Sequence, residues 1–317
     1  MWVVGPRTAE IRPERLRAPG PGEVRVRTTW SGISRGTERL VLEGRVPPSL
    51  AQSMRAPHQA GDFPWPVKYG YCNVGVVEAG ALPAGTRVFC LFPHQDRYVV
   101  GADQVVALPD DEPSERAVLA DNVETAVNAV WDAQVGPGDR VTVVGAGVVG
   151  SLVGWICAGI PGVRVVLVDP LPARAEAARA LGCAWSPPEG APGDQDVVFH
   201  ASATPAGLAT ALSLAGPEAM VVELSWYGTT PVPAPLGEAF HHRRLQLRSS
   251  QVGSLPPARR PRWDYRRRLG LALALLADPA PDVLVDGEVA FEALPVALPE
   301  ICGPAGPLCR RVRYPSS

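Results

Sequence analysis

One stretch decides the fold of this chain: Val141-Thr142-Val143-Val144-Gly145-Ala146-Gly147-Val148-Val149-Gly150. Its first four residues are β-branched and favour a strand, and they run into the pattern G-x-G-x-x-G and then into an apolar segment that is compatible with a helix. The first glycine permits a tight turn, the second lets a phosphate approach the backbone, and the third lets the helix pack closely on the strand. The residues expected to hold such a ligand are Gly145, Ala146, Gly147, Val148, Val149 and Gly150.

A second strand-like run, residues 163–168, follows the expected helix and ends in Asp169. An acidic residue about 20 residues beyond the glycines is typical of dinucleotide-binding β-α-β units, where it accepts hydrogen bonds from an adenosine ribose. A carboxylate at this place also repels the additional phosphate of NADP. The sequence therefore predicts a dinucleotide site that prefers NAD. The alternative interpretation is a glycine-rich turn in an unrelated α/β domain.

Strands and helices alternate after this motif, with strands expected at 163–168, 196–200, 219–224 and 245–252 and helices at 172–181 and 205–214. This alternation predicts a doubly wound parallel sheet of the Rossmann type. The preceding residues are β-rich, and a helix is expected from near Ser114 to about Ala133. A helix at about 261–277 and strands at 283–291 and 308–314 end the chain. We therefore expect an α/β protein whose Rossmann domain (116–253) is inserted into a β-rich domain (1–115 and 254–317).

The composition excludes several classes of protein. The 317 residues are 46% hydrophobic and 20% charged, which is typical of a soluble globular chain long enough for two domains. A net charge of −2 gives no reason to expect nucleic acid or an anionic membrane as a partner. The chain opens on a strand-like segment rather than a signal peptide, and its six cysteines form no C-x-x-C pair. We expect a cytoplasmic protein with reduced thiols that acts on a small molecule.

Several further segments, taken together, resemble the medium-chain dehydrogenase/reductase superfamily, in its alcohol dehydrogenase-like group. They are residues 21–24, 31–38, 69–77, 83–88 and 135–141, and the resemblance extends over essentially the full length. Residues 31–40 are also similar to the bacteriochlorophyllide dehydrogenase branch. The resemblance implies a GroES-like catalytic domain around the Rossmann domain and hydride transfer between nicotinamide and a secondary alcohol or its ketone. It also implies a homodimer, with the strand at 245–252 at the interface.

The chain departs from the zinc-dependent members of this group. They carry a cysteine in a G-x-C-x-T-D motif where this chain has Ser34, and a His-Glu pair where it has Tyr71 and Cys72. If Thr125 is the threonine that contacts nicotinamide, the third ligand position falls near Asp121. A catalytic zinc needs three N, S or O ligands and an open position, and neutral hydroxyl groups are poor ligands. The chain therefore resembles the zinc-independent members, and we expect no bound metal.

Without a metal, side chains must stabilise the charge that develops on the substrate oxygen during hydride transfer. The candidates are Ser34, Thr37, Lys68, Tyr71 and Asp121. Lys68 is the only lysine of the chain, and a cation near Tyr71 would lower the pKa of its phenol. If the segment is extended, however, the two side chains point to opposite faces. Thr125, Ser225 and Val252 are expected beside the nicotinamide ring.

Two other functions remain open at this stage. A quinone or enone reductase adds hydride to carbon and needs less activation of oxygen, but such enzymes usually use NADP, which Asp169 disfavours. A non-catalytic NAD-binding protein would have the same glycine motif.

Overall fold

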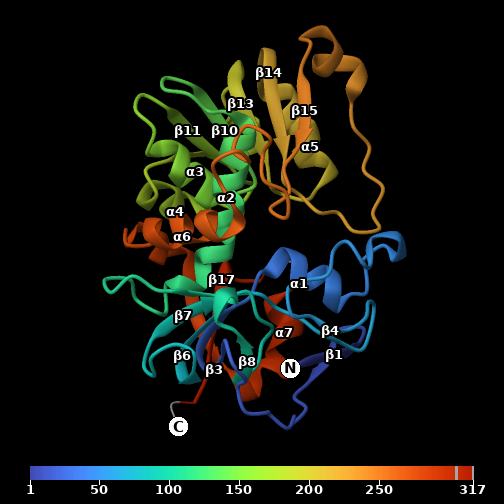
Figure 1. Ribbon diagram of the computed structural model, residues 1–317. Coiled ribbons are helices and arrows are strands. Elements are labelled where there is room, and N and C mark those ends of the chain that lie inside the picture. The colour runs from blue at the N-terminus through green and yellow to red at the C-terminus, as the bar shows by residue number, and fades with distance from the viewer. Residues whose placement is uncertain (304–305, 316–317) are drawn as a thin grey trace. The chain divides into compact units, whose positions relative to one another are not determined.

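In the computed structural model, which describes residues 1–303 and 306–315, the chain forms two compact units (Figure 1). Unit 1 comprises Met1–Asp121 and Leu269–Ser317, and unit 2 comprises Asn122–Arg268. The sequence analysis placed the two joints after residues 115 and 253. In the structure the joints fall inside two helices, α2 (Ala120–Ala133) and α6 (Tyr265–Leu275).

Unit 2 is built on a parallel sheet with the strand order β12-β11-β10-β13-β14-β15. The strands are β10 (Arg140–Val144), β11 (Arg164–Val168), β12 (Ala184–Ser186), β13 (Gln195–His200), β14 (Ala215–Glu223) and β15 (Gln246–Ser249). The helices α3 (Val148–Ala158), α4 (Arg174–Ala180) and α5 (Pro205–Leu214) connect successive strands. The strand order reverses between β10 and β13, and doubly wound sheets bind their ligands at such a switch point.

The apolar runs of the sequence form the core of this sheet, and the expected doubly wound parallel fold is confirmed. Val141 and Val143 of β10 are fully buried, as expected for a strand that is covered on both faces. Leu208 and Leu212 of α5 pack in the same cluster as Val144 and Val198. The carboxyl ends of β10 and β13 are thereby fixed next to each other.

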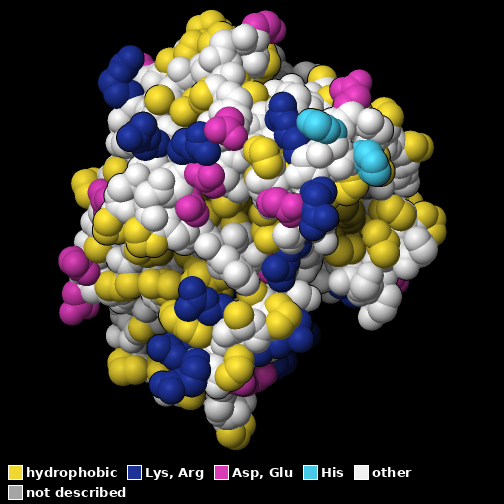
Figure 2. Space-filling model, turned by 90° about the horizontal axis from the view of Figure 1, so that it is seen from above, with side chains coloured by type: hydrophobic (Ala, Val, Ile, Leu, Met, Phe, Trp, Pro, Cys, Tyr) yellow, Lys and Arg dark blue, Asp and Glu magenta, His cyan; other side chains and the backbone are white. Residues whose placement is uncertain are grey.

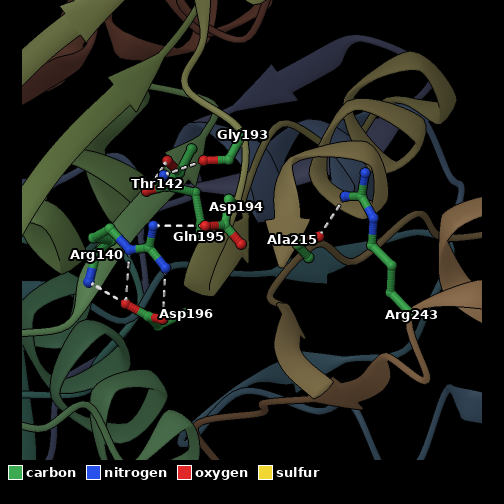
Figure 3. Close-up of polar contacts among 8 residues, drawn as sticks. All are labelled: Arg140, Thr142, Gly193, Asp194, Gln195, Asp196, Ala215 and Arg243. Carbon is green, nitrogen blue, oxygen red and sulfur yellow. Dashed lines mark hydrogen bonds and ion pairs between the residues drawn. The ribbon is translucent and has the colours of Figure 1, made fainter. Parts of the chain in front are cut away.

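Polar contacts align these two strands at the opposite, amino end of the sheet (Figure 3). The guanidinium of Arg140 lies 2.8 Å from Asp194 Oδ2 and 3.2 Å from Asp196 Oδ1. Inside the sheet, Thr142 Oγ1 donates to Gln195 Oε1 at 3.0 Å. Exposed ion pairs add little stability, so we regard the outer contacts mainly as an alignment of β10 with β13.

Unit 1 contains a larger sheet of order β16-β17-β3-β6-β7-β9, in which β8 also pairs with β3. Its strands are β3 (Glu23–Gly32), β6 (Asn73–Gly80), β7 (Arg87–Cys90), β8 (Arg97–Gly101), β9 (Val105–Ala107), β16 (Val285–Ala290) and β17 (Cys309–Arg313). Alternation explains β3, because Val24 and Val26 are fully buried while Arg25 and Arg27 reach Glu78 at 3.0 and 3.6 Å.

A second sheet of unit 1 has the order β2-β1-β5-β4. Its strands are β1 (Trp2–Gly5), β2 (Thr8–Glu10), β4 (Ala60–Gly61) and β5 (Val67–Lys68), and the helices α1 (Arg35–Leu42) and α7 (Leu294–Ile301) belong to the same unit. The expected helix start near Ser114 is wrong. Turns and a 3-10 helix (Ala117–Leu119) precede α2, and the side chain of Arg116 is bound by Asp282 at 2.6 Å.

The surface carries charges of both signs. On the face shown in Figure 2, basic and acidic side chains are both spread among apolar and uncharged ones. Within the described residues, no helix combines the length and the apolar character that a membrane span requires.

Candidate active site

The glycine-rich turn lies between β10 and α3, at the switch point of the sheet. Gly145 has φ +106°, and a Cβ at this residue would lie 2.7 Å from the backbone nitrogen of Ser202. A Cβ on Gly150 would lie 2.0 Å from the carbonyl oxygen of Gly145, whereas a Cβ on Gly147 would meet no atom within 4 Å. The turn is therefore closed where helix and strand meet and open at Gly147, as a phosphate-binding turn must be.

Helix α3 begins directly after this turn, with Gly147 at its N-cap. Among the residues that the structure describes, no side chain caps this helix. The N–H groups of its first turn lack acceptors within the helix, and they lie at the positive end of the helix dipole. Helix starts of this kind bind phosphate groups, so the turn and the helix fit the pyrophosphate of a dinucleotide.

Asp169 follows β11 directly and faces the same turn. Its Oδ2 accepts a hydrogen bond from Ala146 N at 2.9 Å, and its Oδ1 accepts one from Leu171 N at 3.0 Å. These two bonds hold the carboxylate beside the glycines and leave further lone pairs on both oxygens. Because the N–H of Ala146 donates to Asp169, the role of Ala146 is to position that carboxylate.

The other residues expected near the cofactor lie on different elements of unit 2. Thr125 is partly exposed on α2. Ser225 follows β14, where its Oγ accepts from Ala203 N at 3.0 Å. Val252 follows β15, and its carbonyl oxygen accepts from Arg268 Nη2 at 2.6 Å. Ser225 is thereby joined to the turn after β13, and the backbone of that turn packs against Gly145.

In unit 1, the structure brings Ser34 and Tyr71 together. Ser34 is the N-cap of α1, Thr37 lies in the first turn of that helix, and Tyr71 lies between β5 and β6. The hydroxyl of Ser34 lies beside the phenol of Tyr71 and acts to lower its pKa. Burial raises the pKa of Tyr71 well above its usual range, and nearby acidic groups, including Asp121, act in the same direction. At neutral pH the phenol keeps its proton and is a hydrogen-bond donor, not a base.

The contacts of Lys68 are with other residues of unit 1. Its ammonium group lies 2.7 Å from Glu14 Oε2 and 2.8 Å from Gln95 Oε1, and it lies 5.6 Å from the ring centroid of Trp2. The hypothesis that Lys68 lowers the pKa of Tyr71 is wrong, because the pKa of Tyr71 is raised. Since the lysine has its own partners, we leave it out of the proposed chemistry.

Asp121 is buried at the start of α2 and accepts a hydrogen bond from Cys72. The distance from Cys72 Sγ to Asp121 Oδ1 is 2.8 Å, and the carboxylate and burial raise the pKa of the thiol, burial having the larger effect. In the resemblance, these residues stand at the glutamate and the third-ligand position of the zinc enzymes. A neutral serine, a protonated tyrosine and an aspartate already bound to a thiol do not fit a catalytic zinc. In the described part of the chain, no three His, Cys, Asp or Glu residues lie close enough to hold a metal ion.

The sequence analysis missed two buried networks. In unit 1, His94 lies 3.1 Å from Glu38 and 2.8 Å from Ser31 Oγ, and Glu38 also accepts from the N–H of Ser34 at 2.9 Å. Glu38 thus fixes the start of α1, where Ser34 lies. The contact of Glu38 with Ser34 could have been predicted, because Glu38 lies four residues after Ser34. The contact of Glu38 with His94 could not, because His94 is distant in sequence.

In unit 2, His200 lies 2.7 Å from Glu223 Oε2 and 2.7 Å from Ser202 Oγ. His200 and Glu223 are the last residues of β13 and β14. A polar residue at the carboxyl end of a parallel strand is a signal that sequence reasoning could have used.

Comparison with known proteins supports this description. No family model matches the chain. Residues of the chain are 31% identical over 135 positions to the 2-desacetyl-2-hydroxyethyl bacteriochlorophyllide A dehydrogenase of Cereibacter sphaeroides. This match covers 40% of the chain and spans only 39% of that protein.

Solved structures match over almost the whole chain. The 2R,3R-butanediol dehydrogenase of Bacillus subtilis has a TM-score of 0.78 at 17% identity, and 98% of each chain is covered. An alcohol dehydrogenase of Escherichia coli CFT073 in complex with NADH has a TM-score of 0.78 at 18% identity, covering 99% of this chain and 98% of that one. A protein of Sinorhizobium meliloti named as a zinc-binding dehydrogenase, bound to NADP, has a TM-score of 0.78 at 17% identity, with 98% of each chain covered.

At these identities the comparison establishes the fold. The parallel sheet of unit 2 is a Rossmann domain, and the sheets of unit 1, formed by both ends of the chain, are the GroES-like domain. The chain has the fold of the medium-chain alcohol dehydrogenases, with a Rossmann domain inserted into a GroES-like domain.

Proposed function

We propose that this chain is an NAD-dependent, zinc-independent oxidoreductase that transfers a hydride between nicotinamide and a secondary alcohol or its ketone. The observation that carries the proposal is the glycine turn, open at Gly147 and flanked by the carboxylate of Asp169. The fold shared with alcohol and polyol dehydrogenases supports the same class of reaction.

The preference for NAD rests on Asp169. Its Oδ2 is bound to the glycine turn and its Oδ1 to Leu171 N, and both oxygens keep lone pairs that can accept from the ribose hydroxyls of NAD. The additional phosphate of NADP would bring a second negative charge to the same place. Structures with this fold occur with either cofactor, so the choice depends on this residue rather than on the fold.

When bound, the nicotinamide supplies or accepts the hydride. The residues of the chain must then stabilise the substrate oxygen. Tyr71 keeps its proton on Oη and can donate it in a hydrogen bond to that oxygen, with the hydroxyl of Ser34 beside the phenol. Glu38 fixes Ser34 by accepting from its N–H at 2.9 Å. We assign Tyr71 as the donor and Ser34 as its partner, with Thr37 and Asp121 as neighbours of secondary importance.

The proposal extends to the setting of the enzyme. The six cysteines are free thiols, as is usual in a reducing compartment, and we propose the cytoplasm. We also propose a homodimer. β15 lies at an edge of the Rossmann sheet, and Leu247 on this strand is 40% exposed, so pairing with a second copy would cover both the edge and the side chain.

The experiment that tests the proposal is turnover of Tyr71→Phe. Losing one preorganised donor typically costs about 10²–10³ in turnover, so we expect at least a tenfold loss with almost unchanged NADH affinity. Tyr69→Phe is the matched control, since it makes the same change two residues away. Ser34→Ala is expected to lose less.

Wild-type turnover in Tyr71→Phe would contradict the assignment of the donor. If turnover fell in Ser34→Ala instead, the role would pass to that serine. Tight NADH binding without turnover on any ketone or enone would favour the non-catalytic alternative, and reduction of enones alone would favour the reductase.

A further inference from the structure

The network of His200, Ser202 and Glu223 lies at the switch point of the Rossmann sheet. β10 carries the glycine turn, and its neighbours are β11 on one side and β13 on the other. Asp169, at the end of β11, marks the adenosine side. Ser202 lies in the turn after β13, and Gly145 packs against the backbone of that turn. The second half of a dinucleotide that crosses the glycine turn therefore passes toward Ser202.

The direction of each hydrogen bond in this network follows from the carboxylate of Glu223. It accepts from Ser225 N at 2.7 Å, from Tyr227 Oη at 3.0 Å and from His200 Nδ1 at 2.7 Å. Although burial acts to raise the pKa of Glu223, the hydrogen bond from His200 and the further contacts lower it overall, so the group is anionic. A carboxylate only accepts, so the proton of His200 must be on Nδ1.

This tautomer determines what Ser202 can offer to a ligand. When the imidazole of His200 carries one proton, on Nδ1, its Nε2 accepts, and Ser202 Oγ donates to it at 2.7 Å. Thr204 Oγ1 lies 2.9 Å from Ser202 Oγ and accepts from Gly207 N at 3.0 Å, so its own proton is available to Ser202. Ser202 Oγ keeps one lone pair and no free proton.

An acceptor without a free proton selects its ligand chemically. It does not bind phosphate oxygens, which are also acceptors, but it binds hydroxyl and amide N–H donors. The nicotinamide riboside half of NAD has both kinds of donor, in its ribose hydroxyls and its carboxamide. Since His200 is fully buried and Glu223 is mostly buried, the acceptor is held in place before the ligand arrives.

We propose that Ser202 binds the nicotinamide riboside half of the dinucleotide through its hydroxyl oxygen, and that His200 and Glu223 are positioning residues that fix this oxygen as an acceptor. The inference rests on the proposed dinucleotide function and adds a specific contact to it. Neither Ser202 nor its two partners is needed for the adenosine half, which Asp169 and the glycine turn hold.

The test compares NADH with ADP by isothermal titration calorimetry, because ADP has the adenosine and pyrophosphate but lacks the nicotinamide riboside. One neutral hydrogen bond contributes about 0.5–1.5 kcal/mol, which corresponds to roughly a two- to twelvefold change in Kd. We expect Ser202→Ala to weaken NADH by about this factor and to leave ADP unchanged. Ser213→Ala, an exposed serine at the far end of α5, is the matched control.

His200→Asn tests the positioning role, because asparagine can still donate to Glu223 but does not reach Ser202. We expect it to weaken NADH binding in the wild-type background and to have no further effect in the Ser202→Ala background. Unchanged NADH affinity in Ser202→Ala, or equal losses for NADH and ADP, would overturn the inference. A wild-type protein that binds neither ligand would instead overturn the proposed function itself.

Discussion

Replacing Asp169 with asparagine tests the cofactor preference at a single charge. The isosteric change keeps one oxygen that can accept from Ala146 N or Leu171 N, now 2.9 and 3.0 Å from the carboxylate, while it removes the negative charge. Two unit charges about 4 Å apart repel by ~1 kcal/mol in water and by more where the protein excludes solvent. Because Asp169 is partly exposed, we take ~1–2 kcal/mol, or roughly five- to thirtyfold in Kd.

The assay is calorimetric titration of both reduced cofactors against wild type and variant. We expect the wild type to bind NADH more tightly than NADPH by at least about fivefold, and Asp169→Asn to reduce this ratio by a similar factor. Asp194→Asn is the matched control, because Asp194 is an exposed aspartate near the opposite end of the same sheet, paired with Arg140 (Figure 3). The reasoning is refuted if the ratio is the same in Asp169→Asn and wild type, or if the wild type binds NADPH as tightly as NADH.

Two further predictions concern stability and assembly. Burial raises the pKa of Glu112 to about 8, so the folded chain keeps a proton that the unfolded chain loses near pH ~4.3. The free energy of unfolding should therefore fall as the pH rises from about 5 to about 8, by at most ~1.4 kcal/mol per pH unit. In urea unfolding, the free energy of unfolding of Glu112→Gln should fall less over this pH range. An equal fall in the variant and the wild type would exclude Glu112 as its cause. Light scattering should give a dimer mass for the wild type and one chain's mass, near 33.6 kDa, for Leu247→Arg; a monomeric wild type would contradict the proposed interface.

The Rossmann unit was predictable because its signals are local in sequence. A β-branched run, three glycines at fixed spacing and Asp169 at the end of the next strand specify β10, α3 and β11 without knowledge of distant contacts. The helix near Ser114 was misplaced for the opposite reason. Turns and a 3-10 helix precede α2, and Arg116 in this segment binds Asp282, which is far along the chain.

The candidate site was predictable only in part for the same physical reason. The positions of Ser34 and Tyr71 came from a resemblance, but the raised pKa of Tyr71 depends mainly on its burial in the folded chain. The partners of Lys68 are Glu14 and Gln95, which lie on separate segments, so no local pattern predicts them. The contact of His200 with Glu223 is likewise made between neighbouring strands of the folded sheet.

The proposed hydride transfer with NAD and without zinc is tested most directly by two measurements on the same sample. One is the turnover of NAD(H) with a panel of secondary alcohols and ketones, and the other is the zinc content by mass spectrometry. We predict turnover in protein that holds far less than one zinc per chain, with no loss of activity after treatment with a chelator. Activity that rises and falls with one bound zinc per chain would contradict the claim, as would tight NADH binding without turnover of any compound in the panel.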